Sequence, residues 1–396
     1  MPSSPHQTHF QLHKDHPAKF KAAVVRRPGG TLELIDVDFR DPQPGELVLK
    51  VHGCAFSNND GIAINGLLPD SKFPRTPGCA VYGEVVAFGK EKEGAGGRLS
   101  SMLSKVTLGH MGHANGSAQD FKLGDKVLAT FDHQGCAEYC TAEASRTCHI
   151  SEKYEPLDQL FAVSAGASTV AAYKRWVEYH EKLTPQEKAL IEVRNEALRL
   201  GGGGVIIVYG EGGLARLCIT TISAIAPEKL SGHRVVLVTT GTRFSHEDYR
   251  LPKSEDLLTV GKDDVALKLT QMGGVKLAIA ADQPDKGFNE VLDSMRYGGE
   301  VALMTLAGQG KVEVNMAAVL DRSLTLRPPP FLTSPAMRHA LRFLEEHDIR
   351  KHLKVNTSDF TQQGVNEAWQ LAQRRDTMLA PVVVFGFKGG EGPVKA

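Results

Sequence analysis

The stretch VIIVYGEGGLA, residues 205–215, begins as an apolar run, breaks into glycines and continues as a sequence typical of a helix. A short apolar run that ends at such a turn predicts a buried strand followed by a helix. Backbone N–H groups at the turn and the dipole of the helix attract the pyrophosphate of a dinucleotide. The spacing G-x-G-x-x-G/A in this context therefore predicts a Rossmann domain, whose turn contacts the cofactor through Gly210, Gly212, Gly213, Leu214 and Ala215.

The residues after this turn alternate between strand patterns and helix patterns. Strands separated by helices in this rhythm imply a parallel sheet covered on both faces. A further helical region, at 165–200, precedes the turn. The predicted strands lie at 205–210, 234–240, 275–281 and 300–308, and the helices between them lie at 214–226, 263–273 and 287–299.

The end of the second predicted strand indicates which dinucleotide binds. In NAD-binding Rossmann domains an acidic side chain there accepts a hydrogen bond from the 2′-hydroxyl of the adenosine ribose. The segment VVLVTTGTRF, residues 235–244, has no acid and offers Thr239, Thr240, Thr242 and Arg243. Hydroxyl groups and a guanidinium suit a 2′-phosphate, so the sequence predicts NADP(H) as the cofactor. The alternative is that Arg243 is a solvated loop cation.

The composition indicates a multidomain protein with no preference for polyanions. The chain has 396 residues, 41% of them hydrophobic, which is enough for two or more domains. Lys plus Arg equals Asp plus Glu at 46 each, so we expect no nucleic acid and no anionic membrane as a partner. The sequence has neither the apolar segment of a secretory signal nor the roughly 20 apolar residues of a membrane span. We therefore expect a cytoplasmic protein with six reduced cysteines.

The region before the Rossmann segment is rich in short strand patterns cut by turn signals, which predicts an all-β, barrel-like domain. Residues 1–18 predict a flexible tail. The polar segment 90–122, rich in Gly and Ser, predicts an insertion or a flexible loop. After the RPPP break at 327–330, two more helices and a closing strand at 380–387 are predicted.

Several short motifs occur in a fixed order along the chain. They are PQPGELVLKVHGCAFSNND (42–60), FPRTPGCAVYGEVVAFG (73–89), FKLGDKVLA (121–129), AEYCTA (137–142), SAGASTVAAYK (164–174), GEGGLARLC (210–218), MRYGGEVALMTLAG (295–308) and APVVVF (380–385). In this order they resemble the medium-chain dehydrogenase/reductase superfamily of zinc alcohol dehydrogenases, quinone reductases and enoyl reductases. The resemblance implies an α/β protein with a GroES-like β-barrel domain at 19–165, a doubly wound Rossmann domain at 166–327, and a return to the first domain at 328–396.

The resemblance also implies where a catalytic zinc would bind. The ligands in zinc-dependent relatives fall on Ser57, on Cys79 and on a position near Ser164 or in the preceding loop, and the relatives' glutamate after the histidine falls on Ala80. One cysteine does not supply the three protein ligands that a catalytic zinc requires. The four-cysteine structural lobe is also replaced, by the segment 90–122. We therefore predict a zinc-independent member.

Two other groups of metal-binding residue types occur in the sequence. His110 and His113 lie three apart in a polar segment, and we expect solvated side chains there. Cys136 and Cys140 lie on a strand pattern that points both side chains into a core, close in sequence to Cys148. No metal is predicted at either place.

Substrate contacts are predicted at the former zinc positions, in the cleft between the domains. The candidates are Ser57, Asn58, Cys79 and Tyr82. Without a metal, hydrogen-bond donors must stabilise the charge that develops on oxygen during hydride transfer. By residue type Tyr82 is the best proton donor, and the alternative is an ordinary core aromatic. Cys79 is alternatively a small buried hydrophobe, and Asp60 is expected to fix local structure.

The entrance to the Rossmann domain and its outer edge give two further predictions. Ser168 and Thr169 resemble family positions near the nicotinamide, so they are predicted to contact cofactor phosphate or substrate, with capping of the following helix as the alternative. Relatives pair their Rossmann sheets through a strand similar to KVEVNM at 311–316, which implies a homodimer. The third strand ends in LAIAADQPD, residues 277–285, without the glycine that is usual in relatives.

The sequence as a whole predicts an NADPH-dependent, zinc-independent oxidoreductase that transfers hydride to a small organic substrate. The resemblance to metal-free relatives implies an activated C=C bond of an enone, enoyl compound or quinone, or else a carbonyl. One alternative is a metal-free alcohol or ketone dehydrogenase. Another is a noncatalytic NADPH-binding sensor or structural protein, which would bind the cofactor without turnover.

Overall fold

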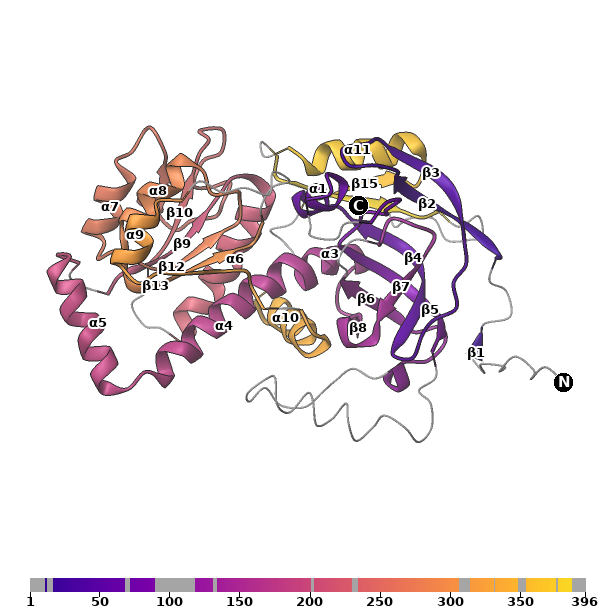
Figure 1. Ribbon diagram of the computed structural model, residues 1–396, viewed down its shortest axis with the longest axis horizontal. Coiled ribbons are helices and arrows are strands. Elements are labelled where there is room, and N and C mark those ends of the chain that lie inside the picture. The colour runs from indigo at the N-terminus through magenta and orange to yellow at the C-terminus, as the bar shows by residue number, and fades with distance from the viewer. Residues whose placement is uncertain are drawn as a thin grey trace.

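The computed structural model has two lobes, one built mainly of antiparallel strands and one built on a parallel sheet (Figure 1). The helix α4 (Ala167–Lys182) leads from the first lobe into the second (Figure 1). The structure describes residues 11–12, 17–67, 72–89, 118–130, 134–200, 203–229, 234–305, 314–330, 332–347, 354–374 and 377–386.

The parallel sheet confirms the predicted doubly wound Rossmann architecture. Its six strands have the order β11-β10-β9-β12-β13-β14, and all neighbours pair in parallel. The strand β9, which ends at the glycine turn, lies between β10 and β12 in the middle of the sheet. The strands are β9 (Val205–Tyr209), β10 (Arg234–Thr239), β11 (Leu257–Thr259), β12 (Val275–Ala280), β13 (Met295–Leu303) and β14 (Thr325–Arg327).

Helices cover both faces of this sheet. Ile206 and Val208 of β9 pack in the same cluster as residues of α4 and α6 (Gly212–Lys229). Ile207 and Tyr209 point the other way and pack with α7 (Val265–Gln271) and α8 (Lys286–Asp293). Burial on both faces explains why β9 is a continuous apolar run.

The first lobe contains an eight-stranded sheet whose main path is β15-β16-β4-β5-β6-β8, and a separate hairpin β2-β3. The closing strand β16 pairs antiparallel with β4, so the end of the chain returns to the first lobe. The strands are β1 (Gln11–Leu12), β2 (Lys19–Val25), β3 (Leu32–Asp38), β4 (Glu46–Ala55), β5 (Ala80–Phe88), β6 (Lys126–Thr130), β7 (Tyr139–Glu143), β8 (Thr147–His149), β15 (Lys354–Asp359) and β16 (Leu379–Val384).

The helical stretch predicted at 165–200 is present as α4 and α5 (Pro185–Ala197). Thr184 caps α5, because its side chain accepts from the Glu187 N–H while the Glu187 carboxylate accepts from the Thr184 N–H. A π-helical turn at Ala162–Gly166 joins α3 (Pro156–Phe161) to α4. The other helices are α1 (Asn58–Ile64), α9 (Met316–Asp321), α10 (Ser334–His347) and α11 (Gln362–Ala372).

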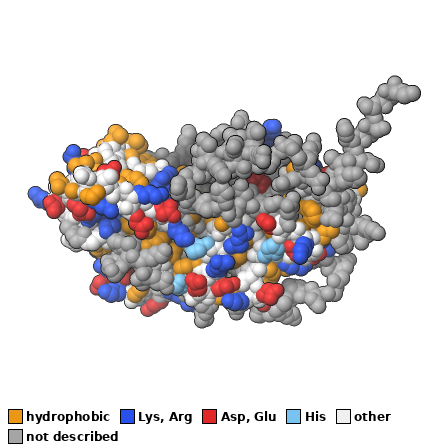
Figure 2. All heavy atoms as spheres, turned by 90° about the horizontal axis from the view of Figure 1, so that it is seen from below, with side chains coloured by type: hydrophobic (Ala, Val, Ile, Leu, Met, Phe, Trp, Pro, Cys, Tyr) orange, Lys and Arg blue, Asp and Glu red, His pale blue; other side chains and the backbone are white. Residues whose placement is uncertain are grey.

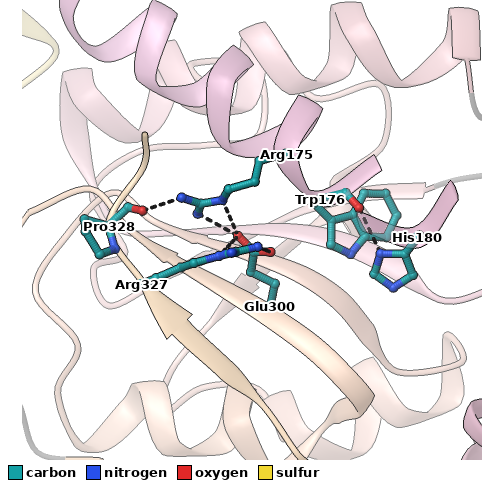
Figure 3. A network of polar contacts seen from close by, with 6 residues as sticks. All are labelled: Arg175, Trp176, His180, Glu300, Arg327 and Pro328. Atoms are coloured by element: carbon teal, nitrogen blue, oxygen red, sulfur yellow. Dashed lines mark hydrogen bonds and ion pairs between the residues drawn. The ribbon is translucent and has the colours of Figure 1, made fainter. Parts of the chain in front are cut away.

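A buried carboxylate attaches α4 to the edge of the Rossmann sheet (Figure 3). Glu300 of β13 is 2% exposed and accepts hydrogen bonds from Arg175 of α4 and Arg327 of β14, with shortest N···O distances of 2.7 and 2.5 Å. Arg175 also donates to the Pro328 carbonyl (2.7 Å). Two guanidinium groups therefore compensate one buried charge, as such a charge requires.

Some elements differ from the sequence predictions. The helix predicted at 287–299 ends at Asp293, and β13 begins at Met295. The predicted strand at 311–316 lies partly outside the described residues, and its last residue, Met316, begins α9. The helix α1 and the strands β11, β14 and β15 were not predicted. β11 and β14 have three residues each, too few to show a period, and β15 is a mostly polar sequence, KVNTSD.

Basic and acidic side chains are interspersed on the described part of the face in Figure 2, in agreement with the balanced composition. None of the helices in the described segments combines the length and apolar character needed to cross a membrane.

Candidate functional site

The glycine turn after β9 has the backbone that its sequence predicts. Gly210 and Gly212 have φ angles of +144° and +73°, which L side chains rarely adopt. A Cβ on Gly210 would lie 3.0 Å from Asp282 Cβ, and a Cβ on Gly213 would lie 3.2 Å from the Met378 carbonyl oxygen. The turn thus needs glycine for its shape and for close neighbours on two sides.

The start of α6 lies against the returning end of the chain. The Gly213 N–H donates to the Thr377 carbonyl (2.9 Å), just before β16. The Gly212 N–H donates to the Tyr249 hydroxyl (3.2 Å). Burial raises the Tyr249 pKa to about 12, so this hydroxyl stays protonated at neutral pH. Both lobes therefore contribute to the surroundings of the turn.

The two residues that follow the glycines in the turn have different exposures. Ala215 is fully buried, in the cluster shared with β9 and α4, whereas Leu214 is partly buried. The small side chain of Ala215 allows α6 to pack close to the sheet, which is the role of the last position of the motif.

The four residues predicted to bind the 2′-phosphate lie at the carboxyl end of β10 and differ in their exposure to solvent. Thr239 is 1% exposed, and its Oγ1 accepts from the Gly241 N–H (3.2 Å). Thr240, Thr242 and Arg243 are exposed. The guanidinium carbon of Arg243 lies 5.9 Å from the ring centre of the next residue. Thr239 therefore shapes the turn, while the other three lie on the surface.

The structure adds an acidic group at this strand end that the sequence analysis missed. A Cβ on Gly241 would lie 2.0 Å from Glu211 Oε1 and 2.4 Å from Oε2, so the Glu211 carboxylate packs directly on the Gly241 backbone. Glu211 belongs to the glycine turn, not to β10. The signal was the acid at the x of G-x-G, a position that the motif leaves open.

In the first lobe, Asp60 forms hydrogen bonds with the two segments that contain Ser57 and Cys79, where the zinc ligands of relatives would fall. It is fully buried, and its carboxylate accepts from the Gly78 N–H (2.7 Å) and the Ser57 N–H (2.8 Å). The Ser57 hydroxyl also lies 3.4 Å from the same carboxylate. Cys79 follows Gly78 in the sequence, and its thiol donates a hydrogen bond to the Ala55 carbonyl (3.6 Å). Asp60 thus fixes local structure, as expected from the sequence.

Cys79 holds its proton firmly. Burial raises the pKa of its thiol well above the usual range, and the nearby Asp60 charge raises it further. A thiol in such surroundings is a weak hydrogen-bond donor and not a nucleophile.

A residue of α1 contacts the Rossmann sheet directly. Asn59 Nδ2 donates to the Met304 carbonyl (3.1 Å), one residue beyond β13. Ser57 and Asp60 are its near neighbours in sequence. This hydrogen bond brings the former zinc positions to the carboxyl edge of the sheet, where ligands of doubly wound folds bind. Asn59 was not predicted as a site residue. The predicted substrate contact was Asn58, whose side chain lies outside the described residues.

Tyr82 lies in different surroundings from Ser57 and Cys79. It is partly buried on β5, and its ring centre lies 5.4 Å from that of His52 on β4. Burial raises the Tyr82 pKa, and the neighbouring Lys126 opposes that shift. The structure therefore brings Ser57, Asp60 and Cys79 together and places Tyr82 beside His52.

Thr169 and Ser168 lie in the first turn of α4. Thr169 is fully buried and donates to the Ala165 carbonyl (2.8 Å), with Cys218 Sγ 3.3 Å away. It does not cap α4, because the helical chain is continuous from α3 through the π-helical turn. Ser168 is partly buried.

The donor set at the former zinc positions does not fit a catalytic zinc. Both Asp60 oxygens accept backbone N–H bonds, and Ser164 donates to the Leu160 carbonyl (3.0 Å), which leaves Cys79 as the one thiol at these positions. No group of three potential ligands with suitable spacing occurs among the described residues. His110 and His113 lie outside those residues. Cys136, Cys140 and Cys148 are buried, as expected for core thiols.

Two cavities lie away from Ser57, Cys79 and Tyr82. One of about 890 Å³ is lined by Thr242, Arg243 and residues of the β11–α7 region. Another, of about 530 Å³, lies between the β2–β3 hairpin and β7. The exposed side of Arg243 therefore faces an open space next to the end of β10.

Comparison with known proteins agrees with this arrangement. Residues 43–184 match the family model of the alcohol dehydrogenase GroES-like domain. The chain is 27% identical over 371 residues to an alcohol dehydrogenase of Geobacillus stearothermophilus, covering 89% of this chain and 96% of the relative. These matches, together with the two-lobed fold, support a place for the chain in the medium-chain dehydrogenase/reductase superfamily.

Two other similar proteins show the range of this superfamily. An acryloyl-coenzyme A reductase of Metallosphaera sedula is 25% identical over 293 residues, covering 68% of this chain and 79% of the relative. The acetophenone reductase of Geotrichum candidum, solved in complex with NAD, has a TM-score of 0.64 at 16% identity, covering 93% of this chain and 98% of the other. This last likeness confirms the medium-chain dehydrogenase/reductase fold.

Proposed function

We propose that this protein is a nicotinamide-dependent oxidoreductase that acts on a small carbonyl compound or an activated C=C bond without zinc. The observation that carries the proposal is the Asn59 hydrogen bond to Met304, because it joins Ser57 to the carboxyl edge of the Rossmann sheet. Relatives named as an alcohol dehydrogenase and an acryloyl-coenzyme A reductase support both substrate classes.

The glycine turn fits a dinucleotide. The support is the order of a buried strand, a glycine turn and a helix, because α6 presents its positive dipole end at the turn, where a pyrophosphate would bind. A nicotinamide cofactor supplies or accepts hydride when bound. For the phosphorylated form, NADP(H), the support is the exposed pair Thr242 and Arg243, because a guanidinium pairs well with a phosphate.

The first lobe supplies hydrogen-bond donors for the substrate oxygen. Ser57 is the strongest candidate, because Asp60 fixes its backbone and the residue is partly exposed. Cys79 keeps its thiol proton but donates it to the Ala55 carbonyl, so it would serve the substrate only by releasing that carbonyl. Donors held in place before the reaction stabilise developing negative charge without reorganisation. Tyr82 is proposed as a proton donor only if it moves away from His52.

The test is a titration of metal-stripped protein with NADPH and NADH, followed by nicotinamide fluorescence, with elemental analysis of the untreated protein. Turnover is then measured with an enone, a quinone, an enoyl-coenzyme A thioester and a ketone. Binding of a nicotinamide cofactor and turnover of one class without stoichiometric zinc are expected. Cofactor binding without turnover would favour a noncatalytic protein, and one zinc per chain would favour a zinc alcohol dehydrogenase.

A further inference from the structure

We propose that Glu211 determines cofactor specificity by accepting a hydrogen bond from the 2′-hydroxyl of the adenosine ribose and by repelling a 2′-phosphate. Glu211 then opposes Arg243, so the protein accepts both NADH and NADPH. This inference rests on the proposed function, because it requires a dinucleotide at the glycine turn.

The position of the carboxylate carries the first step. The ribose of a Rossmann-bound dinucleotide lies at the carboxyl end of the second strand, where an acid marks NAD. That strand is β10, and Gly241 lies two residues beyond its end. The Glu211 carboxylate packs against the Gly241 backbone, so it occupies this place although it comes from another segment.

The backbone on either side of Glu211 supports a fixed direction for the side chain. Gly210 and Gly212 have φ angles of +144° and +73°, and their N–H groups donate to the Val238 carbonyl and the Tyr249 hydroxyl. Any side chain at position 241 would collide with the carboxylate, since even a Cβ would lie 2.0 Å away. The glycine at 241 therefore makes room for Glu211.

The charges around the turn give the second step. A second carboxylate, Asp282, follows β12 on the other side of β9, with its Cβ 3.0 Å from the place of a Cβ on Gly210. A phosphate carries about −1.5 to −2 charge at neutral pH and would come close to the Glu211 carboxylate. Arg243, exposed at the same loop, attracts that phosphate. The two forms of the cofactor are thus favoured by different residues.

The experiment compares two ligands that differ only in the 2′-phosphate, adenosine 5′-monophosphate and adenosine 2′,5′-bisphosphate, by isothermal titration calorimetry on the full chain. For the unmodified protein we expect dissociation constants within about tenfold of each other. Glu211→Gln should strengthen bisphosphate binding by about tenfold relative to the monophosphate, because it removes the repelling charge and keeps the shape.

Glu33→Gln is the matched control. It removes the same charge from a partly exposed side chain that pairs with Arg26 in the first lobe. We expect no change in the ratio of the two dissociation constants. Glu211→Ala is the second variant, and thermal unfolding of each variant checks that it folds.

The outcomes separate the two proposals. An unchanged ratio in folded Glu211→Gln and Glu211→Ala, or an equal change in Glu33→Gln, overturns the role of Glu211. Failure of the unmodified protein to bind either adenosine ligand, NADH or NADPH overturns the proposed function itself. Arg243→Ala should weaken only the bisphosphate, and equal weakening of both ligands would contradict the opposition between Arg243 and Glu211.

Discussion

Asn59 of α1 donates a 3.1 Å hydrogen bond to the Met304 carbonyl at the end of β13, so a side chain of the first lobe is attached to the backbone of the second. Two residues away lies Ser57, the candidate donor to the substrate, whose hydroxyl is 3.4 Å from the Asp60 carboxylate. The side-chain amide of Asn59 therefore fixes the position of α1, and of Ser57 next to it, relative to the carboxyl edge of the Rossmann sheet.

Asn59→Ala should lower kcat/KM by about tenfold, because a 1 Å misplacement of reacting groups costs up to about a hundredfold. The thermal midpoint should change little, since a single hydrogen bond contributes only about 1 kcal/mol. Steady-state kinetics and thermal unfolding measure both effects. The control is Asn65→Ala at the exposed C-cap of the same helix. A loss of activity no larger than that of the control would contradict the prediction.

Ser57→Ala should lower kcat by about 10² if its hydroxyl stabilises the substrate oxygen, as removal of one such donor does elsewhere. Tyr82→Phe should have a smaller effect, because Tyr82 lies beside His52. Single-turnover measurements with saturating cofactor separate chemistry from binding. A larger loss in Tyr82→Phe would make Tyr82 the principal proton donor and displace Ser57.

Stability should fall as the pH drops from about 6.5 to about 4, in part through His52. Burial, together with the nearby Lys126 charge, lowers the pKa of His52 to about 4. Between these pH values the unfolded chain binds a proton that the folded chain does not, so lowering the pH stabilises the unfolded state relative to the folded state. The contribution is about 2 kcal/mol once the partial exposure of His52 is taken into account. Urea unfolding of His52→Gln should show a flatter pH dependence, and an unchanged profile would refute this assignment.

Glu300→Gln should destabilise the second lobe by about 2–4 kcal/mol, because Arg175 and Arg327 lose their shared buried counter-ion. Denaturant unfolding measures the loss. Glu346→Gln, an exposed position near the end of α10, serves as control. Equal stability of the two variants would show that the network in Figure 3 contributes nothing to stability.

The Rossmann half of the fold was predictable because its signals are local. β9 and the glycine turn form one continuous stretch, and burial on both faces makes the strand uniformly apolar. The alternation of strands and helices then followed. By contrast, β11 and β14 have three residues each and carry no period of their own. They are strands because a neighbouring strand supplies the hydrogen bonds.

The candidate site was harder to predict because its contacts join distant segments. Asn59 and Met304 are far apart in sequence, and no spacing rule connects them. Glu211 illustrates the same difficulty at short range, since the expected acid was sought on β10 and the structure supplies it from the turn. Asp60 was predicted correctly as a structural residue, because its match to a family motif lies within one continuous segment.

The hydrogen bond from the Gly213 N–H to the Thr377 carbonyl has a consequence for biosynthesis. During translation the glycine turn leaves the ribosome long before Thr377 does, and domains form in the order of their synthesis. The parallel sheet is complete once β14 has been made, whereas the turn still lacks its neighbour from the first lobe. A nascent chain stalled before Thr377 would therefore have a complete parallel sheet, while the Gly213 N–H would still lack its carbonyl acceptor from the first lobe.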